Sequence, residues 1–183
     1  MIEGEKWGIE TEPKPMINNY CDYSTPPHLN SPLWQQPQVI RWSQILAHSY
    51  QQLLGKELVS AANTPEELAR TLFQASFVVV SHGIQADPIL NYGNQTALQL
   101  WSLSWSELTK TPSRLTAEPI NRETRAAMLE RVAKQGYIDN YQGIRISSTG
   151  KRFSIEQAVV WNLHDRLGRK CGQAATFADW TWL

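Results

Sequence analysis

The chain has 183 residues and a formal net charge of zero at pH 7. This length allows one well-filled hydrophobic core with short additions. The balanced charge gives no reason to expect a nucleic acid or an anionic membrane as a partner. The longest apolar run, at residues 77–80, is too short to cross a bilayer. We therefore expect no nucleic-acid partner and no membrane partner.

The two cysteines and the first residues of the chain bear on its compartment. Neither Cys21 nor Cys171 belongs to a CxxC pair, which favours reduced thiols. The acidic N-terminus lacks the basic and then apolar segments of a secretory signal. Together these features predict a cytoplasmic protein.

The composition divides the chain into three parts. Six of the ten prolines lie in residues 1–37, which predicts an irregular N-terminal arm. Residues 38–75 are expected to form helices that precede the main domain. Residues 76–183 are expected to form that domain.

The first predicted helix runs from Val39 to about Leu54, and Gly55 is a plausible end. Apolar residues recur at helical spacing along one of its faces. Either this face docks on its own domain, or part of it forms a homodimer interface. The candidate interface residues are Val39, Trp42, Leu46 and Leu53.

An abrupt strand-to-helix corner follows the second predicted helix, which begins with the cap Thr64. Strands are expected at 77–80 and 89–92. Gly93 would supply a backbone conformation that other residues avoid. Asn94 would cap the helix that ends near Trp101.

The last third of the chain is predicted to be strands. A helix at 121–135 precedes them, and Ile144 and Ile146 alternate in the first strand. Every second residue from Phe153 to Leu163 is apolar except Gln157. This order of elements predicts an α+β fold, with a five-stranded antiparallel sheet, helices on one face and a preceding N-terminal helix.

The residues of the corner and of the last hairpin resemble a known family. Asn94, Trp101 and Trp105 look like the opening of a PAS domain, and the stretch from Asp165 to Thr181 looks like its closing hairpin and final strand. More specifically, the segments NYGN and GQAATF resemble the MEKHLA domain. This PAS-like family occurs free-standing in bacteria and at the C-terminus of plant homeodomain–leucine-zipper transcription factors. The resemblance covers about residues 38–183.

The resemblance implies a sensory or partner-binding module, which passes its signal through the flanking helix at 39–54. A small apolar ligand would lie in a cavity between sheet and helices. Gln157 is expected to face inward with its apolar neighbours, where its amide needs a backbone or ligand partner. The candidate cavity residues are Gln157, Trp161, Asn94, Tyr92 and Trp101.

The identity of a cofactor stays unknown from the sequence. The reactive cysteine motif of flavin photosensors is absent, and the helix at 121–135 has no histidine for haem. His82 and His164 are the remaining candidates for a haem ligand. The sequence argues against both cofactors. No HxH, HExxH or paired CxxC motif suggests a metal site.

No catalytic residues are assigned. Ser81 and His82 are adjacent on a strand, so their side chains should point to opposite faces and could not form a triad. We expect a non-catalytic regulatory module that binds a small molecule or a protein partner. The alternative is a small cone-shaped α+β enzyme of the ketosteroid-isomerase type, which acts on an apolar substrate in an internal pocket.

Overall fold

The structure is a computed structural model that describes residues 31–183 with the exception of residue 61. The predicted arm, 1–37, lies mostly outside the described residues. The helices are α1 (Pro37–Leu54), α2 (Pro65–Phe73), α3 (Gln95–Trp101), α4 (Trp105–Leu108) and α5 (Arg122–Gln135), with short 3₁₀ helices η1 (Leu33–Gln35), η2 (Ser113–Thr116) and η3 (Pro119–Asn121). The strands are β1 (Val78–His82), β2 (Leu90–Gly93), β3 (Tyr137–Ile146), β4 (Arg152–His164), β5 (Lys170–Phe177) and β6 (Trp180–Trp182).

The strands form one antiparallel sheet in the order β2-β1-β5-β4-β3, and β6 pairs with the first part of β4. The long strand β4 therefore has β3 on one side, and first β6 and then β5 on the other. The sequence predicted five strands. The sixth arises because the chain resumes pairing with β4 after a break at Ala178 and Asp179.

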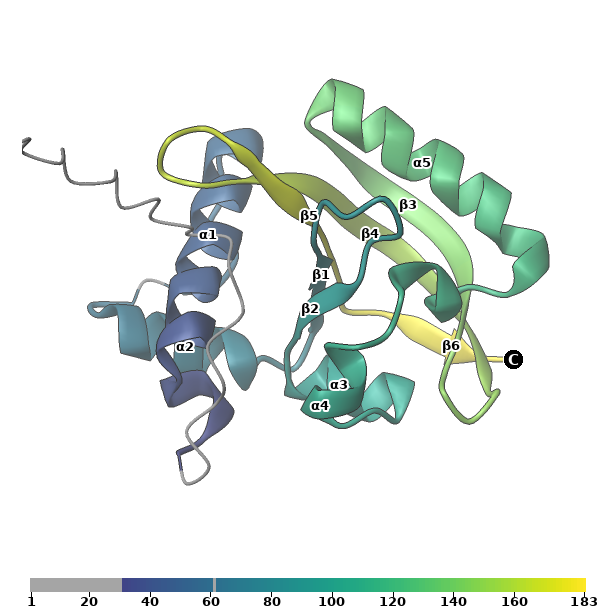
Figure 1. Cartoon of the computed structure of the whole chain (residues 1–183), viewed down its shortest axis with the longest axis horizontal. Helices are drawn as coiled ribbons and strands as arrows, with labels where there is room; N and C mark the ends of the chain where they lie inside the picture. The colour runs from purple at the N-terminus through teal and green to yellow at the C-terminus, as the bar shows by residue number, and fades with distance from the viewer. Residues whose placement is uncertain (1–30, 61) are drawn as a thin grey trace, which may run out of the picture.

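Helices cover both faces of this sheet (Figure 1). On one face, α1 packs against β4 in a core that contains Trp42 and Trp161. On the other face, α5 lies along β3 and β4, and α3 packs against β1 and β2. The α+β class, the antiparallel sheet and the preceding helix are confirmed. The predicted single layer of helices is incomplete, because α1 covers the second face.

The ends of the first two helices follow their sequence signals. Gly55 ends α1 in the left-handed conformation with φ of 68°, where a side chain would be strained. Thr64 caps α2 by accepting a hydrogen bond from the Glu67 amide at 3.1 Å. These local signals suffice because each end is satisfied by residues within one turn.

The strand-to-helix corner is built around Asn94, which is fully buried. Its Oδ1 accepts hydrogen bonds from the amides of Ala97 at 3.1 Å and Val79 at 3.0 Å, and its Nδ2 donates to the Phe77 carbonyl at 2.7 Å. The predicted cap is confirmed, and it also joins α3 to β1. The predicted role of Gly93 is wrong, because its φ is not positive. A Cβ there would meet the Leu108 side chain instead.

The alternation along β4 breaks at Gln157, which has a φ of 52°. Ile155 pairs with Gly143 of β3, but Ala158 pairs with Tyr141, so β4 has one extra residue at this point. This β-bulge reverses which face the following side chains occupy. Gln157 is exposed, and its predicted inward orientation is therefore wrong.

The predicted homodimer seam of α1 is covered by the protein's own sheet. Val39, Trp42 and Leu46 are at most 1% exposed, and Leu53 packs against the same core. Val39, Trp42 and Leu46 cannot form an interface with a second copy while α1 is docked, and Leu53 is half-buried. Docking of α1 on its own domain is favoured because β1, β4 and β5 offer it a continuous apolar face.

The expectation of reduced cysteines is wrong for Cys171, which is disulfide-bonded. Cys21 lies outside the described residues. The disulfide removes one of the two arguments for a cytoplasmic location. Within residues 31–183, apart from residue 61, no helix combines the length and apolar character that a membrane span requires.

Candidate ligand-binding cavity

A cavity of about 50 Å³ lies between the sheet and α5. Its apolar wall comes from strands and helices of the second face, including Val80, Met128, Ile155, Ala158 and Phe177. Among the described residues that line it there is no Asp, Glu or Cys. Its polar side chains include His82, Thr116, Arg125, Tyr141, Arg145 and Gln173, and Trp101 adds an indole N–H.

A row of polar side chains crosses three neighbouring strands beneath α5. The register places His82 of β1 opposite Gln173 of β5, and Gln173 opposite Asn162 of β4. Gln173 Nε2 donates to Asn162 Oδ1 at 3.1 Å and to the Leu129 carbonyl of α5 at 3.0 Å. Asn162 Nδ2 donates to the Val132 carbonyl at 2.9 Å. These amides hold α5 on the sheet and are themselves satisfied.

Arg145 enters the cavity from β3 although its side chain is charged. It pairs with Phe153, whose side chain is buried, so its own side chain shares that face and is only 6% exposed. Its guanidinium donates to the Ile144 carbonyl at 2.9 Å and to the Tyr141 hydroxyl at 3.3 Å. It also lies over the Tyr141 ring, at 5.3 Å from the centroid. None of these partners carries a negative charge.

Arg125 enters the same cavity from the first half of α5. It makes no hydrogen bond or ion pair with any described residue. Burial and the nearby Arg145 lower the pKa of Arg125 to about 10. The guanidinium is still protonated at neutral pH, so two positive charges face a space that has no carboxylate in its wall.

Two further polar atoms at the cavity have no hydrogen-bond partner among the described residues. His82 is 7% exposed, and its Nδ1 bonds to the Gly83 carbonyl at 2.8 Å. A carbonyl only accepts, so Nδ1 carries the proton and Nε2 is an unpaired acceptor. Trp101 also lines the cavity, and its buried Nε1–H donates to nothing. Buried polar atoms are normally paired, so these two lining residues offer one acceptor and one donor that the described residues leave unused.

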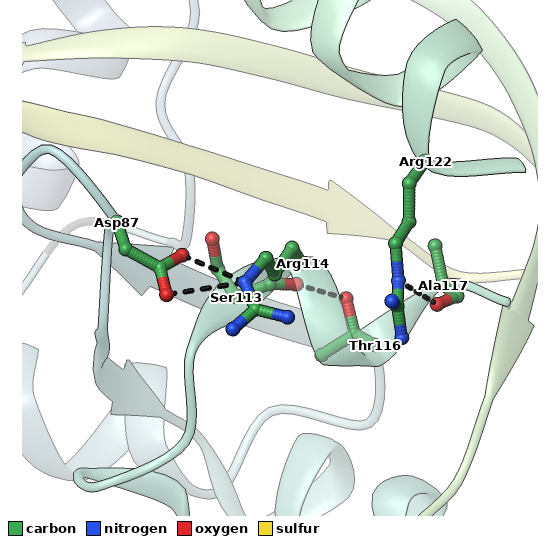
Figure 2. Close-up of polar contacts among 6 residues, drawn as sticks. All are labelled: Asp87, Ser113, Arg114, Thr116, Ala117 and Arg122. Atoms are coloured by element: carbon green, nitrogen blue, oxygen red, sulfur yellow. Dashed lines mark hydrogen bonds and ion pairs between the residues drawn. The ribbon is translucent and has the colours of Figure 1, made fainter. Parts of the chain in front are cut away.

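One rim of the cavity is formed by η2, which contributes Thr116. Figure 2 shows how the neighbouring residues hold this turn. Arg114 Nε lies 3.1 Å from both carboxylate oxygens of Asp87, in the loop before β2. On the other side, Arg122 Nε donates to the Ala117 carbonyl at 3.3 Å. The rim is thus tied to the sheet edge and to the start of α5.

This arrangement of a five- to six-stranded antiparallel sheet, a short-helix corner and a long helix over a small cavity matches a known family. The model of the MEKHLA domain matches residues 40–182. The chain belongs to the MEKHLA domain family. The family is PAS-like and sensory, which confirms the expected class of regulatory module.

Curated proteins similar to this MEKHLA domain are plant homeobox-leucine zipper proteins. Homeobox-leucine zipper protein HOX9 of Oryza sativa subsp. indica is 23% identical over 150 residues, which are 81% of this chain and 18% of that protein. Homeobox-leucine zipper protein REVOLUTA of Arabidopsis thaliana is 22% identical over 129 residues, which are 69% of this chain and 15% of that protein. The chain thus spans less than a fifth of the length of these relatives.

Solved structures similar to the MEKHLA domain are PAS and light-oxygen-voltage domains. The PAS domain of a protein from Colwellia psychrerythraea has a TM-score of 0.52 at 16% identity, covering 59% of this chain and 89% of that domain. A light-oxygen-voltage domain studied with a flavin analogue has a TM-score of 0.51 at 16% identity, covering 63% of this chain and 84% of the other. At these identities the likeness concerns the fold alone.

The cavity of the MEKHLA domain does not fit a flavin or a haem as the chain is arranged here. Ligand pockets for molecules of drug size measure about 300–1,000 Å³, whereas this one has about 50 Å³. No cysteine lines it, and His82 is the one histidine among its described lining residues. His164 lies at the end of β4, outside this lining. Among the described residues no group of three His, Cys, Asp or Glu could hold a metal.

Of the five predicted cavity residues, the structure places Trp101 at the cavity. Trp161 and Tyr92 are fully buried in the core beneath α1, on the opposite face of the sheet. Asn94 is the cap at the corner, and Gln157 faces solvent. The bulge at Gln157 accounts for the position of Trp161, because it sends Ile155 and Trp161 to different faces.

The charged residues of the cavity were missed by the sequence reasoning, although one signal existed. Arg125 precedes Met128 by three residues and Leu129 by four, which places it on the apolar face of its helix. Arg145 gave a misleading signal, because the alternation of Ile144 and Ile146 suggested that it faced solvent. The structure buries Arg145 and leaves both isoleucines half-buried.

Proposed function

We propose that this MEKHLA domain senses a small molecule in the cavity and transmits its presence to α1 through the sheet. The domain acts without catalysis. The proposal rests on the sheet being a single layer, with the cavity on one face and α1 on the other. A ligand that changes the spacing or twist of the strands must therefore act on the surface that holds α1.

Adjacent residues in β4 support this coupling. Val160 lines the cavity, and the next residue, Trp161, packs edge-on against Tyr50 of α1 with ring centroids 5.0 Å apart. At the end of the same strand, Ser49 Oγ accepts a hydrogen bond from the His164 amide at 3.0 Å. Side chains of one strand thus contact the ligand space and the flanking helix. Because protein interiors are close-packed, a displacement of side chains on one face of the sheet also displaces those on the other face.

The residues that line the cavity give little support to the alternative, an enzyme of the ketosteroid-isomerase type. Such a site uses an acidic or imidazole base close to the substrate. The described lining contains no Asp or Glu. His82 has its Nδ1 engaged by the Gly83 carbonyl and has no carboxylate to orient it or to stabilise its charged form. Recognition, not proton transfer, is the activity that these residues support.

Filling the cavity tests the coupling without any ligand. Ala158 is fully buried and lines the cavity, so Ala158→Phe should mimic occupancy. We expect hydrogen exchange of the α1 amides, residues 39–54, to change by about threefold or more. Ala133→Phe is the matched control, because Ala133 is exposed on α5.

Unchanged α1 exchange in a folded Ala158→Phe protein would show that cavity and helix are not coupled. If this substitution unfolds the domain, Ala175→Leu fills the same cavity from a half-buried position on β5. The same comparison of α1 exchange with wild type then decides the question.

A further inference from the structure

The charge of the cavity wall points to the chemical class of its guest. Arg125 from α5 and Arg145 from β3 both line the space, and no described lining residue is acidic. Arg125 has no hydrogen-bond or ion-pair partner among the described residues. Burying charges without an opposite charge is costly. An anion bound in the cavity would lower the electrostatic cost of holding these two arginines there.

Two further lining residues, His82 and Trp101, each carry a buried polar atom with no hydrogen-bond partner among the described residues. His82 Nε2, in a side chain that is nine-tenths buried, is an acceptor, so an ionised carboxylate does not bond to it. The buried Nε1–H of Trp101 is a donor with no acceptor. A carboxylate has two oxygens with about four acceptor sites, so it can take donors from Arg125, Arg145 and Trp101 together.

The size of the cavity and the apolar part of its wall limit the length and polarity of the ligand beyond its acid group. A cavity of about 50 Å³ has room on the order of three or four water molecules. Val80, Ile155, Ala158, Val160 and Phe177 surround it with hydrocarbon. A short alkyl chain would lie against these side chains, with its acid group toward the arginines.

We propose that the cavity binds a short-chain organic carboxylate, with Arg125 and Arg145 as its anion-binding residues. This inference rests on the proposed sensory function and names the class of its ligand. Occupation of the site sets one negative charge against the two guanidinium groups and offers the indole N–H of Trp101 an acceptor. The empty domain keeps two guanidinium groups without an opposite charge among the described lining residues, at a cost in stability, as binding sites commonly do.

The test compares acids with their uncharged isosteres on the full chain. Acetate, propionate and butyrate are titrated beside acetamide, propionamide and butyramide at constant ionic strength. Binding is followed by calorimetry and by the indole N–H NMR signal of Trp101, assigned with Trp101→Phe. We expect the acids to bind at least tenfold more tightly than the amides and to shift the Trp101 signal.

Substitution of one arginine provides the matched variant. Arg125→Gln should weaken propionate binding at least tenfold and leave the melting temperature of the ligand-free protein equal or higher, because no described partner of Arg125 is lost. Arg125→Lys should restore part of the binding. Arg131→Gln is the control, because Arg131 is exposed on the same helix, and it should bind propionate as wild type does.

Three results would overturn the carboxylate inference. If the amides bind as tightly as the acids, the site does not recognise the negative charge of the ligand. If Arg125→Gln leaves binding unchanged, the ligand binds elsewhere. Inorganic phosphate that binds as tightly as propionate would reduce the site to a general anion site. None of these results decides whether the cavity is coupled to α1, because that coupling is tested with cavity-filling substitutions and without a ligand.

Discussion

Ser81 and His82 are neighbours in β1 and face opposite sides of the sheet. Ser81 Oγ accepts a hydrogen bond from Trp42 Nε1 of α1 at 2.9 Å, whereas the His82 ring lines the cavity under α5. The prediction that these two side chains cannot meet in a triad is confirmed. Their arrangement has another consequence, since one short strand links the flanking helix to the candidate ligand space.

The contact of Trp42 with Ser81 should contribute to the docking of α1. Trp42→Phe keeps most of the apolar surface and removes the indole donor. We expect a loss of about 1 kcal/mol in the free energy of unfolding, because Ser81 Oγ retains its bond to Asn91 Oδ1 at 2.7 Å. Urea unfolding measures this loss. His48→Ala, at an exposed position of α1, should change stability by less than about 0.5 kcal/mol, and a similar change in both variants would contradict the assignment.

His82 should make the protein less stable in acid. Burial, with smaller effects from Arg125 and Lys170, lowers the pKa of His82 from 6.5 to about 4 in the folded state, against the opposing effect of its hydrogen bond to Gly83. The unfolded state therefore takes up a proton first as the pH falls. Stability is at its full value above about pH 6.5 and decreases between pH 6.5 and 4, by about 2–3 kcal/mol at pH 4.5.

The measurement is urea unfolding at pH 7 and pH 4.5 for wild type and His82→Gln. The variant should lose less stability over this interval, by about 2–3 kcal/mol. His48→Gln serves as the control for an exposed histidine on the opposite side of the sheet. An identical pH dependence in wild type and His82→Gln would show that His82 is not the group responsible.

Asn94 should be among the most sensitive positions in the chain. Its replacement by alanine leaves the buried Val79 amide and Phe77 carbonyl without their partners, in addition to the lost cap of α3. We expect a loss of about 2–4 kcal/mol, since each unsatisfied buried group costs about 1–3 kcal/mol. Thr64→Ala removes an exposed cap and should cost about 1 kcal/mol. Equal losses at both sites would mean that Asn94 acts only as a cap.

The effect of a substitution at Gln157 on stability should depend on the backbone conformation that the new residue allows, and not on the chemistry of its side chain. Its φ of 52° is strained for a β-branched residue and relaxed for glycine. Gln157→Val should therefore lower the free energy of unfolding by about 1–3 kcal/mol, and Gln157→Gly should leave it equal or higher. Glu156→Val tests the neighbouring exposed position. If Gln157→Val is as mild as Glu156→Val, the bulge is not fixed by this residue.

The sequence by itself determined the elements whose signals are local. Gly55 and Thr64 mark helix ends with bonds inside one turn, and Asn94 caps α3 through the Ala97 amide three residues away. Such contacts depend on the identity of a few neighbouring residues and on little else. The motifs NYGN and GQAATF likewise indicated the family over the length that the family model matches.

The tertiary structure alone decided which side chains meet. A single extra residue at Gln157 reversed the faces of β4, so that Trp161 packs on α1 while Ile155 lines the cavity. Arg125 and Arg145, twenty positions apart, come together only because α5 folds back over β3. Strand pairing sets these positions through register, and register is a property of two strands that neither strand's sequence pattern contains.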